Sequence, residues 1–450
     1  MTQKAQQIHF IAIGGSIMHN LALALHDKGY IVTGSDDHVY EPSKSRLSKA
    51  GILPQSFGWD TSKVNKDLDC VILGMHAKVD NPELLKAQEL GVKIYSFPEY
   101  IYQQSIDKQR IVIAGSHGKT STTSMIMHVL KANDIDFDYA VGASIEGFDR
   151  MVKLSDAPFI IIEGDEYLSS PLDLRPKFLN YQPHIALING IAWDHINVFK
   201  TFKDYLKQFE LLSNIVPKGG ALIYNVSDKY VKKIAEANKR EDILKIDYKV
   251  HSHKIKKGIT YLKTGNGDVE IKIFGEHNLI NLNAARLICE RVGIREDKFY
   301  NSIQNFTGAG KRLEIISKNS DRVIFKDFAH APSKVSATIE ATKEQYGKQQ
   351  LTAILELHTF SSLSKEFLPQ YAKSMNKADE AYIYLSKETL KRKGGNDISD
   401  SEIQKAFANK KITVIRDVNG LGGVIKQIPS QNNILLMSSG DFDGLDMSSI

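Results

Sequence analysis

Cysteine is scarce in this sequence, and long apolar runs are absent. The 450 residues include two cysteines, Cys70 and Cys289, and both lie in short apolar segments. We therefore expect buried free thiols and no disulfide framework. No run approaches the about 20 apolar residues that span a bilayer, and the first residues, MTQKAQQIHFIAIGG, lack the apolar core and cleavage site of a signal peptide. These observations predict an enzyme-sized cytoplasmic protein with no membrane partner.

An excess of one charge is lacking as well. The chain has 58 basic and 53 acidic residues, which gives a net charge of +5. The lysine-rich stretch at 254–257 is better explained as a solvated surface than as a nucleic-acid footprint, since no nucleic-acid-binding signature accompanies it. The charge pattern therefore predicts no nucleic-acid partner.

The length predicts about three domains, because a single hydrophobic core stops growing at about 250–300 residues. Up to about residue 106, short apolar runs alternate with helical patterns, as in a parallel α/β sheet. A Gly14-Gly15 turn follows the first run, but Ala12 interrupts the complete dinucleotide fingerprint. The strands are expected within 8–15, 30–36, 70–74 and 92–96. The sequence thus predicts a βαβ start and gives little support for NAD binding.

Two further α/β units follow along the chain. Apolar runs at 159–166 and 184–195 end in acidic residues or histidine, and ligands of open α/β sheets gather at such strand ends. Residues 221–275 are typical of β structure, with a hairpin turn at 265–267, and 278–293 have a helical pattern. After 308–314, strands alternate with helices again, beginning with a strand at 322–330 and a helix from about 333 to 346. The predicted fold is α/β, with three domains in series.

Residues 110–124, RIVIAGSHGKTSTTS, carry the strongest functional signal. An apolar run breaks at Gly115, and Gly118, Lys119 and Thr120 open a helical pattern. A strand that ends in a glycine loop before a helix presents unpaired N–H groups to an anion. The loop amides and Lys119 would surround nucleotide phosphates, and the Thr120 hydroxyl would point at a magnesium ion. Two residues, rather than the usual four, separate the two glycines.

This short loop and six other motifs, in this order, resemble the Mur ligases, the ATP-dependent amide-forming enzymes of peptidoglycan assembly. The other motifs are the Gly15 turn, EGDE (163–166), WDH (193–195), GEHNLINLNAA (275–285), GKRLE (310–314) and DFAHAP (327–332). The resemblance implies a Rossmann-like UDP-substrate domain at 1–106, a central P-loop ATP domain at 107–311 and a Rossmann-like domain for the amino acid or peptide at 312–450. It also implies a monomer or weak homodimer.

The resemblance implies an activity and its cofactors. ATP phosphorylates the carboxylate of UDP-N-acetylmuramate in the presence of Mg²⁺, and an amine then displaces phosphate from the acyl phosphate. HVYEP (38–42) and MSSGDFDG (437–444) resemble the subgroup that adds L-alanyl-γ-D-glutamyl-meso-diaminopimelate during wall recycling. The alternative acceptor is L-alanine. Folylpolyglutamate synthesis is disfavoured by residues 1–106, and a non-catalytic nucleotide switch by the intact motifs.

Individual roles follow from the resemblance. Catalytic roles are expected for Lys119, His195, Arg312 and His330. ATP binding is expected for Gly115, Ser116, His117, Gly118, Lys119, Thr120, Ser121, Asn278, Asn281, Arg312 and Asp327. The UDP part of the substrate would meet Gly14, Gly15, Ser16, Ser35 and Asp36. Thr120 and Glu163 would hold one Mg²⁺, and His195 would touch a second metal near the acyl phosphate.

Several positions keep two interpretations. Asp165 and Glu166 either support the metal ligands or cap local structure, and Asn278 is either an adenine contact or a helix cap. Glu210, near Lys207, either replaces the carbamylated lysine of some family members or lies on a helix surface. Departures from the family concentrate where the amine should bind. Residues 356–364 contain no arginine, Lys311 replaces a frequent arginine, and Asp441 and Asp443 replace smaller residues.

Overall fold

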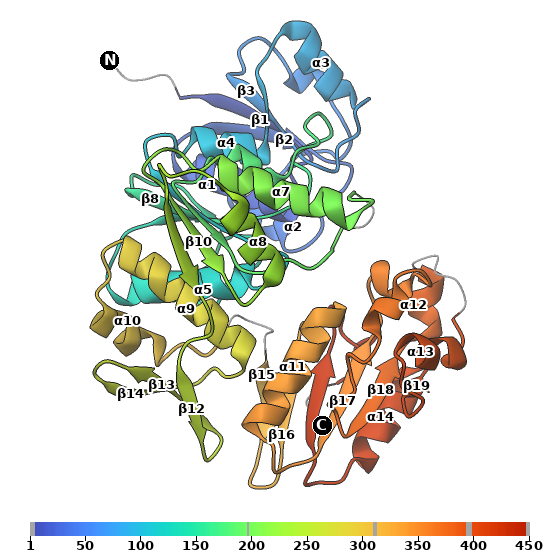
Figure 1. The fold of residues 1–450 in the computed structure, drawn as a ribbon. Coiled ribbons are helices and arrows are strands. Elements are labelled where there is room, and N and C mark those ends of the chain that lie inside the picture. Colours follow the sequence, from blue (N-terminus) through green and yellow to red (C-terminus); the bar gives the residue numbers. More distant parts are fainter. Residues whose placement is uncertain (1–4, 196–197, 309–312, 393–397, 447–450) are drawn as a thin grey trace. The chain divides into compact units, whose positions relative to one another are not determined.

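The computed structural model describes residues 5–195, 198–308, 313–392 and 398–446. The chain divides into two compact units, Met1–Lys249 with Asn283–Phe299, and Val250–Leu282 with Tyr300–Ile450. Each unit combines sheets and helices, which confirms the predicted α/β class (Figure 1). The domain boundaries at 106/107 and 311/312 stay predictions.

The first sheet of the first unit is parallel, in the order β2-β1-β3-β4. The central strands are almost wholly buried and apolar, as strands covered on both faces must be. The bounds are β1 Gln7–Ile11, β2 Ile31–Ser35, β3 Cys70–Leu73 and β4 Ile94–Ser96. The helices are α1 Ser16–Asp27, α2 Ser43–Lys49, α3 Pro82–Leu90 and α4 Phe97–Gln103. The expected strands and the βαβ start are confirmed.

The second sheet has seven strands in the order β11-β10-β9-β5-β8-β6-β7, and only the β6–β7 pairing is antiparallel. Central β5 has five consecutive buried residues, Arg110–Ala114. The strands are β5 Gln109–Ala114, β6 Asp138–Ala140, β7 Val152–Lys153, β8 Phe159–Gly164, β9 Ile185–Ile188, β10 Ala221–Asn225 and β11 Leu244–Tyr248. The helices are α5 Lys119–Ala132, α6 Lys177–Asn180, α7 Phe202–Asn214 and α8 Lys229–Ala237.

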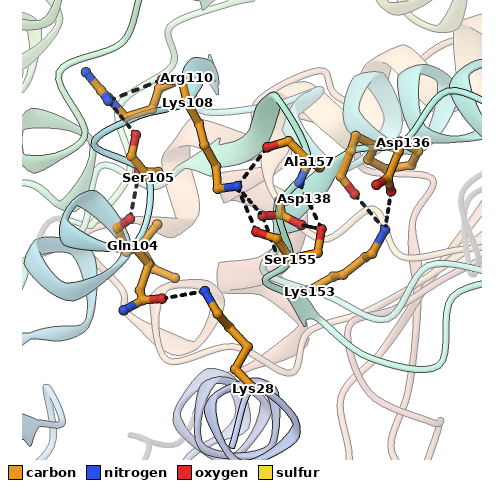
Figure 2. A network of polar contacts seen from close by, with 12 residues as sticks. Lys28, Gln104, Ser105, Lys108, Arg110, Asp136, Asp138, Lys153, Ser155 and Ala157 are labelled. Atoms are coloured by element: carbon orange, nitrogen blue, oxygen red, sulfur yellow. Dashed lines mark hydrogen bonds and ion pairs between the residues drawn. The ribbon is translucent and has the colours of Figure 1, made fainter. Parts of the chain in front are cut away.

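Buried polar contacts fix the segment that leads from the first sheet to the second (Figure 2). Lys108 Nζ donates to the carbonyls of Ser155 and Ala157 at 2.8 and 2.7 Å and lies 3.3 Å from Asp138 Oδ2. Arg110 donates to the Ser105 carbonyl at 2.6 Å. Because these cations are buried with their acceptors, they satisfy backbone groups that the turn leaves unpaired. The contacts thereby fix the start of β5, which ends at the phosphate loop.

The second unit begins with an antiparallel sheet of β12 His253–Lys256, β13 Ile259–Thr264 and β14 Gly267–Ile271. Gly265 and Asn266 join β13 to β14, which confirms the predicted hairpin turn. Gly267, with φ of +109°, sits where a side chain would be strained. The helices α9 Glu276–Arg291 and α10 Glu296–Ile303 follow, and each contributes residues to both units.

A six-stranded sheet completes the second unit, in the order β15-β16-β20-β17-β18-β19. All its pairings are parallel except β15 with β16. The strands are β15 Glu314–Lys318, β16 Val323–Asp327, β17 Leu351–Glu356, β18 Glu380–Tyr384, β19 Thr413–Ile415 and β20 Asn433–Met437. The helices are α11 Pro332–Gln345, α12 Lys387–Arg392, α13 Asp400–Ala406 and α14 Val418–Gln427.

The sequence predicted neither a membrane-spanning segment nor a disulfide. Among the described residues, no helix has both the length and the apolar character that crossing a membrane would require. Cys70 and Cys289 are both buried and unbridged, as predicted.

Candidate active site

The loop between β5 and α5 is shaped by close backbone approach. Gly115 has a φ of +131°, and a side chain there would meet the backbone N and O of Gly190 at 3.0 Å. Gly118, with φ of +81°, directly precedes α5. The Ser116 amide donates to the Gly190 carbonyl at 2.8 Å, and Asn189 Nδ2 donates weakly to the His117 carbonyl at 3.4 Å. The two glycines of the loop are therefore required by geometry.

Lys119 is the first residue of α5, directly after this loop, and its ammonium lies between two acceptors. Its Nζ donates to the Gly115 carbonyl at 2.6 Å and to Glu166 Oε2 at 2.7 Å. Burial alone would lower the pKa of Lys119, but Glu166 and other nearby carboxylates raise it above its ordinary value. Lys119 is therefore a charged donor held at the N-terminus of α5.

Glu166 is the centre of a buried polar cluster. Its carboxylate is 1% exposed and also accepts from the Tyr205 hydroxyl at 3.0 Å, while His195 Nε2 lies 3.6 Å away. Burial, the largest single influence, would raise the pKa of Glu166, but the charges and hydrogen bonds of Lys119 and His195 together outweigh it, so the pKa lies well below its usual range. The Tyr205 hydroxyl also bonds Ser116 Oγ at 2.6 Å.

Glu163 is the penultimate residue of β8 and lies beside the same loop. Thr120 Oγ1 lies 3.4 Å from Glu163 Oε2, and burial raises the pKa of Glu163, an effect that Lys119 partly offsets. Its other oxygen, Oε1, is buried and has no hydrogen-bond partner among the described residues. A buried carboxylate oxygen without a partner is costly unless a cation or donor satisfies it. Thr120 and Glu163 therefore fit a magnesium ion, which prefers hard oxygen ligands.

His195 follows β9 with a left-handed backbone, φ +52°. Asp194 Oδ1 accepts the His195 amide at 2.7 Å, and the Tyr167 ring lies edge-on at 5.0 Å. Burial would lower the pKa of His195, but the Glu166 contact and the Asp194 charge raise it. Ligand atoms of Glu166, Asp194 and His195 lie within 4.8 Å of one another, a spacing that fits a metal ion. The sequence likewise assigned His195 to a second metal, apart from the one expected at Thr120 and Glu163, but it named no further ligands for that metal.

The predicted UDP-site residues gather at the carboxyl ends of β1 and β2. The Gly14 amide donates to Asp36 Oδ2 at 2.7 Å, and burial raises the pKa of Asp36. Gly15 precedes α1, and Ser35 Oγ accepts from Lys63 Nζ at 3.2 Å. Ser16 opens α1, and its hydroxyl lies 3.5 Å from Met151 Sδ. Lys63 was not identified from sequence, because a lone lysine in a loop carries no distinctive signal.

Of the nucleotide residues predicted in the second unit, Asn278, Asn281 and Asp327 are buried, and they lie on segments that are far apart in the sequence. Asn278 Nδ2 donates to the Phe274 carbonyl at 2.9 Å, and Asn281 is 5% exposed one turn later in α9. Asp327 accepts the Leu313 and Ala329 amides at 2.7 and 2.6 Å. His330 Nδ1 bonds the Phe328 carbonyl at 2.8 Å. Arg312 and Lys311 lie outside the described residues.

The ends of β17 and β20 adjoin, since Leu355 pairs with Met437. Glu356 is 2% exposed. Its Oε2 accepts from Ser438 Oγ and, at 3.0 Å, from the Phe442 amide. His358 Nδ1 lies 3.4 Å from Glu356 Oε1.

The loop after β20 adds two further carboxylates. Asp443 accepts from the Tyr384 hydroxyl at 2.8 Å, and Asp441 is exposed. With Glu356, this makes three carboxylates on the segments that follow β17 and β20. This end of the sheet is therefore rich in acidic groups.

Two further predicted positions lie elsewhere in the first unit. Glu210 pairs with Lys207 at 3.1 Å on an exposed face of α7, which agrees with the helix-surface interpretation. Asp165 pairs with Lys177 at 2.5 Å. Tyr205 was missed altogether, because an aromatic residue in an amphipathic helix is normally part of the core.

Family models match most of the chain in three consecutive pieces. A model of the Mur ligase family catalytic domain matches residues 7–108, one of the Mur ligase middle domain matches 113–289, and one of the Mur ligase glutamate ligase domain matches 311–440.

Curated relatives carry two different names. A UDP-N-acetylmuramate–L-alanine ligase of Sulfurihydrogenibium sp. is 32% identical over 84% of this chain and 82% of its own length. A UDP-N-acetylmuramate–L-alanyl-γ-D-glutamyl-meso-2,6-diaminoheptandioate ligase of Haemophilus influenzae is 27% identical over 98% of this chain and 97% of its own length.

Solved structures show the same fold over nearly the full length. A UDP-N-acetylmuramate–alanine ligase from Thermotoga maritima superposes with a TM-score of 0.67 at 20% identity, covering 97% of this chain and 96% of that one. A murein peptide ligase from Psychrobacter arcticus gives 0.64 at 22% identity, covering 99% and 98%. At these identities the likeness shows the fold alone.

Proposed function

Since the chain belongs to the Mur ligase family, and is thus an ATP-dependent ligase that forms an amide bond on UDP-N-acetylmuramate, we propose that its acceptor is L-alanyl-γ-D-glutamyl-meso-diaminopimelate. An enzyme that takes a preformed tripeptide belongs to peptidoglycan recycling, in the cytoplasm. We keep the division into domains at 1–106, 107–311 and 312–450 as part of this proposal.

The choice of acceptor rests on the negative charge at one end of the six-stranded sheet, after β17 and β20. Residues 357–364 after β17 contain neither lysine nor arginine, and Lys365 is paired with Glu402 at 2.7 Å. A free amino acid needs a cation, usually arginine, to hold its carboxylate. The acidic groups Glu356, Asp441 and Asp443 suit the side-chain ammonium of diaminopimelate instead. The motifs at 38–42 and 437–444 favour the same acceptor.

L-Alanine is the second candidate, because relatives carry that name too. The 32% identity of the Sulfurihydrogenibium enzyme is higher than the 27% of the Haemophilus tripeptide enzyme, although its alignment covers less of this chain. Overall identity is an average over all aligned positions, whereas the acceptor is selected by the few residues that touch it. We therefore give the local charge more weight.

We infer a separate role for each group of residues at the phosphoryl-transfer site. The loop amides and the Lys119 ammonium oppose the charge that develops on the transferred phosphoryl group. Thr120 and Glu163 would hold Mg²⁺, which supplies charge neutralisation at the phosphate oxygens when bound. His195, with Glu166 and Asp194, would hold a second cation on the acyl-acceptor side. Gly14 and Asp36 would receive the UDP part of the substrate.

Phosphate release with UDP-N-acetylmuramate, ATP and a panel of acceptors tests the proposal. The tripeptide should exceed L-alanine and the dipeptide L-alanyl-γ-D-glutamate in kcat/KM by at least about tenfold. Asp441→Asn should raise the KM for the tripeptide about threefold or more and leave the KM for ATP unchanged. Glu236→Gln, which changes an exposed carboxylate on α8, is the matched control. An equal or higher kcat/KM with L-alanine would overturn the choice of acceptor.

A further inference from the structure

We propose that Tyr205 is a positioning residue for phosphoryl transfer, and that it acts through Glu166 on Lys119. Tyr205 lies on α7, and its hydroxyl bonds Ser116 and Glu166, so it reaches the loop lysine through Glu166. The proposal concerns the ATP step that both candidate acceptors share. It therefore does not depend on which acceptor is used.

A chain of hydrogen bonds runs from the backbone through Tyr205 to Lys119. The Ala192 amide donates to Ser116 Oγ at 3.0 Å, and Ser116 Oγ lies 2.6 Å from the Tyr205 hydroxyl. The single proton of the Tyr205 hydroxyl goes to Glu166 Oε1 at 3.0 Å, since a carboxylate can only accept. Ser116 Oγ is therefore the donor to the Tyr205 oxygen. Glu166 Oε2 then accepts from Lys119 at 2.7 Å. Each hydroxyl in the chain thus has one donor and one acceptor.

The two oxygens of Glu166 are fixed by different neighbours. Oε1 is held by Tyr205 and approached by His195, and Oε2 is held by Lys119. A carboxylate without a fixed Oε1 can rotate about its last side-chain bond, which has a broad torsional preference. Lys119 would then keep the Gly115 carbonyl but lose a fixed Glu166, the second of the two acceptors that orient its ammonium. The Tyr205 hydroxyl thereby contributes to the direction in which the ammonium points.

Because the Tyr205 ring packs in the core by itself, its hydroxyl can be removed without loss of the packing that supports the fold. The Tyr205 ring is fully buried and meets Phe199 at 5.3 Å and Phe209 at 5.4 Å, both edge-on. Phenylalanine retains all of these ring contacts and removes one oxygen. Tyr205→Phe should therefore keep the fold of α7 while it releases Glu166.

The test compares full-length Tyr205→Phe with the wild-type enzyme. We expect kcat for phosphate release to fall about tenfold, with the KM for UDP-N-acetylmuramate within about twofold. The affinity for a non-hydrolysable ATP analogue, which needs no acceptor, should fall about fivefold. If neither acceptor supports turnover, the proposed acceptor fails, and the analogue affinity still decides the role of Tyr205.

A double-mutant cycle separates positioning from a general structural effect. Because Tyr205 acts through Glu166, Tyr205→Phe combined with Glu166→Gln should be no slower than Glu166→Gln alone. Tyr100→Phe is the matched control, since Tyr100, on α4, is 4% exposed and its hydroxyl accepts from Gln104 at 3.3 Å. Additive effects, or wild-type kcat and analogue affinity in Tyr205→Phe, would overturn the proposal. If Tyr205→Phe does not fold, an unchanged kcat in Glu166→Gln overturns it as well.

Discussion

Among single residues, Lys119 connects the shape of the loop to its chemistry. Its ammonium bonds a backbone carbonyl of the glycine loop and a carboxylate that is almost completely buried. A cation in this setting is desolvated and directed before the reaction, so it stabilises developing charge without reorganisation at the moment of transfer. The same geometry explains why its pKa lies above the ordinary value in spite of burial.

Removal of this cation should abolish most of the activity. Lys119→Ala should lower kcat by about 10³-fold or more, since it removes several kcal/mol of transition-state stabilisation. Steady-state phosphate release measures it. Lys207→Ala, on the exposed face of α7, should remain within about twofold of the wild type. A loss of less than about tenfold in Lys119→Ala would show that Lys119 does not oppose the phosphoryl charge.

Glu163 should determine the metal requirement, because its buried Oε1 lacks a hydrogen-bond partner among the described residues. Glu163→Gln keeps the shape but removes the charge that attracts a divalent cation. The Mg²⁺ concentration for half-maximal activity should rise about tenfold or more, and turnover at saturation should fall. Mn²⁺ binding, followed by electron paramagnetic resonance with ATP analogue present, is the direct measurement. Unchanged Mn²⁺ affinity would refute the assignment.

At the scale of elements, the turn from β5 into α5 is constrained by the strand beside it. A side chain at Gly115 would meet backbone atoms of Gly190 and Asn189 at 3.0 to 3.2 Å, at a φ of +131°. Backbone atoms cannot move aside as the end of a flexible side chain can. The loop that carries the proposed phosphate site is therefore shaped by the residues that follow β9 as much as by its own sequence.

Gly115→Ala should accordingly destabilise the protein by about 1–3 kcal/mol and lower its affinity for an ATP analogue. Thermal unfolding followed by calorimetry gives the stability change. Gly423→Ala is the control, since a side chain at Gly423 in α14 meets nothing within 4 Å, and alanine should there stabilise the helix by about 0.5–1 kcal/mol. A Gly115→Ala variant as stable as the wild type would contradict the described turn.

The elements themselves were largely predictable, because each has a local cause. Apolar runs that stop at Gly115, Glu163 and Asp327 predicted strands whose ends carry polar groups, and the structure ends β5, β8 and β16 at or next to these residues. The 265–267 turn was predicted from its glycines. The role of Ala12, which takes a left-handed φ of +68° where glycine is usual, was not, since alanine gives no such signal.

At the scale of the whole molecule, the order of motifs identified the family, but contacts between segments far apart in the chain could not be predicted from the sequence. Tyr205 meets partners 39 and 89 residues away, and nothing local distinguishes a core tyrosine from one that bonds a carboxylate. Asp165 and Glu166 are adjacent, yet one pairs with Lys177 and the other with Lys119. Only the fold separates their roles.

The acceptor is the claim on which the account of the whole molecule depends. This claim is supported by three carboxylates that lie near two strand ends. Glu356 ends β17, and Asp441 and Asp443 lie in the loop after β20. Both segments lie in the second unit and are brought together by the pairing of β17 with β20. Acidic groups at this end of the sheet offer partners to the second ammonium of the tripeptide, on its diaminopimelate side chain, which L-alanine lacks.

Competition between the two acceptors tests this claim most directly. The enzyme is supplied with ATP, Mg²⁺, UDP-N-acetylmuramate and equimolar tripeptide and L-alanine, and the products are identified by mass. We predict that UDP-N-acetylmuramyl-L-alanyl-γ-D-glutamyl-meso-diaminopimelate predominates. Predominant UDP-N-acetylmuramyl-L-alanine would contradict the account and identify the chain as an L-alanine ligase.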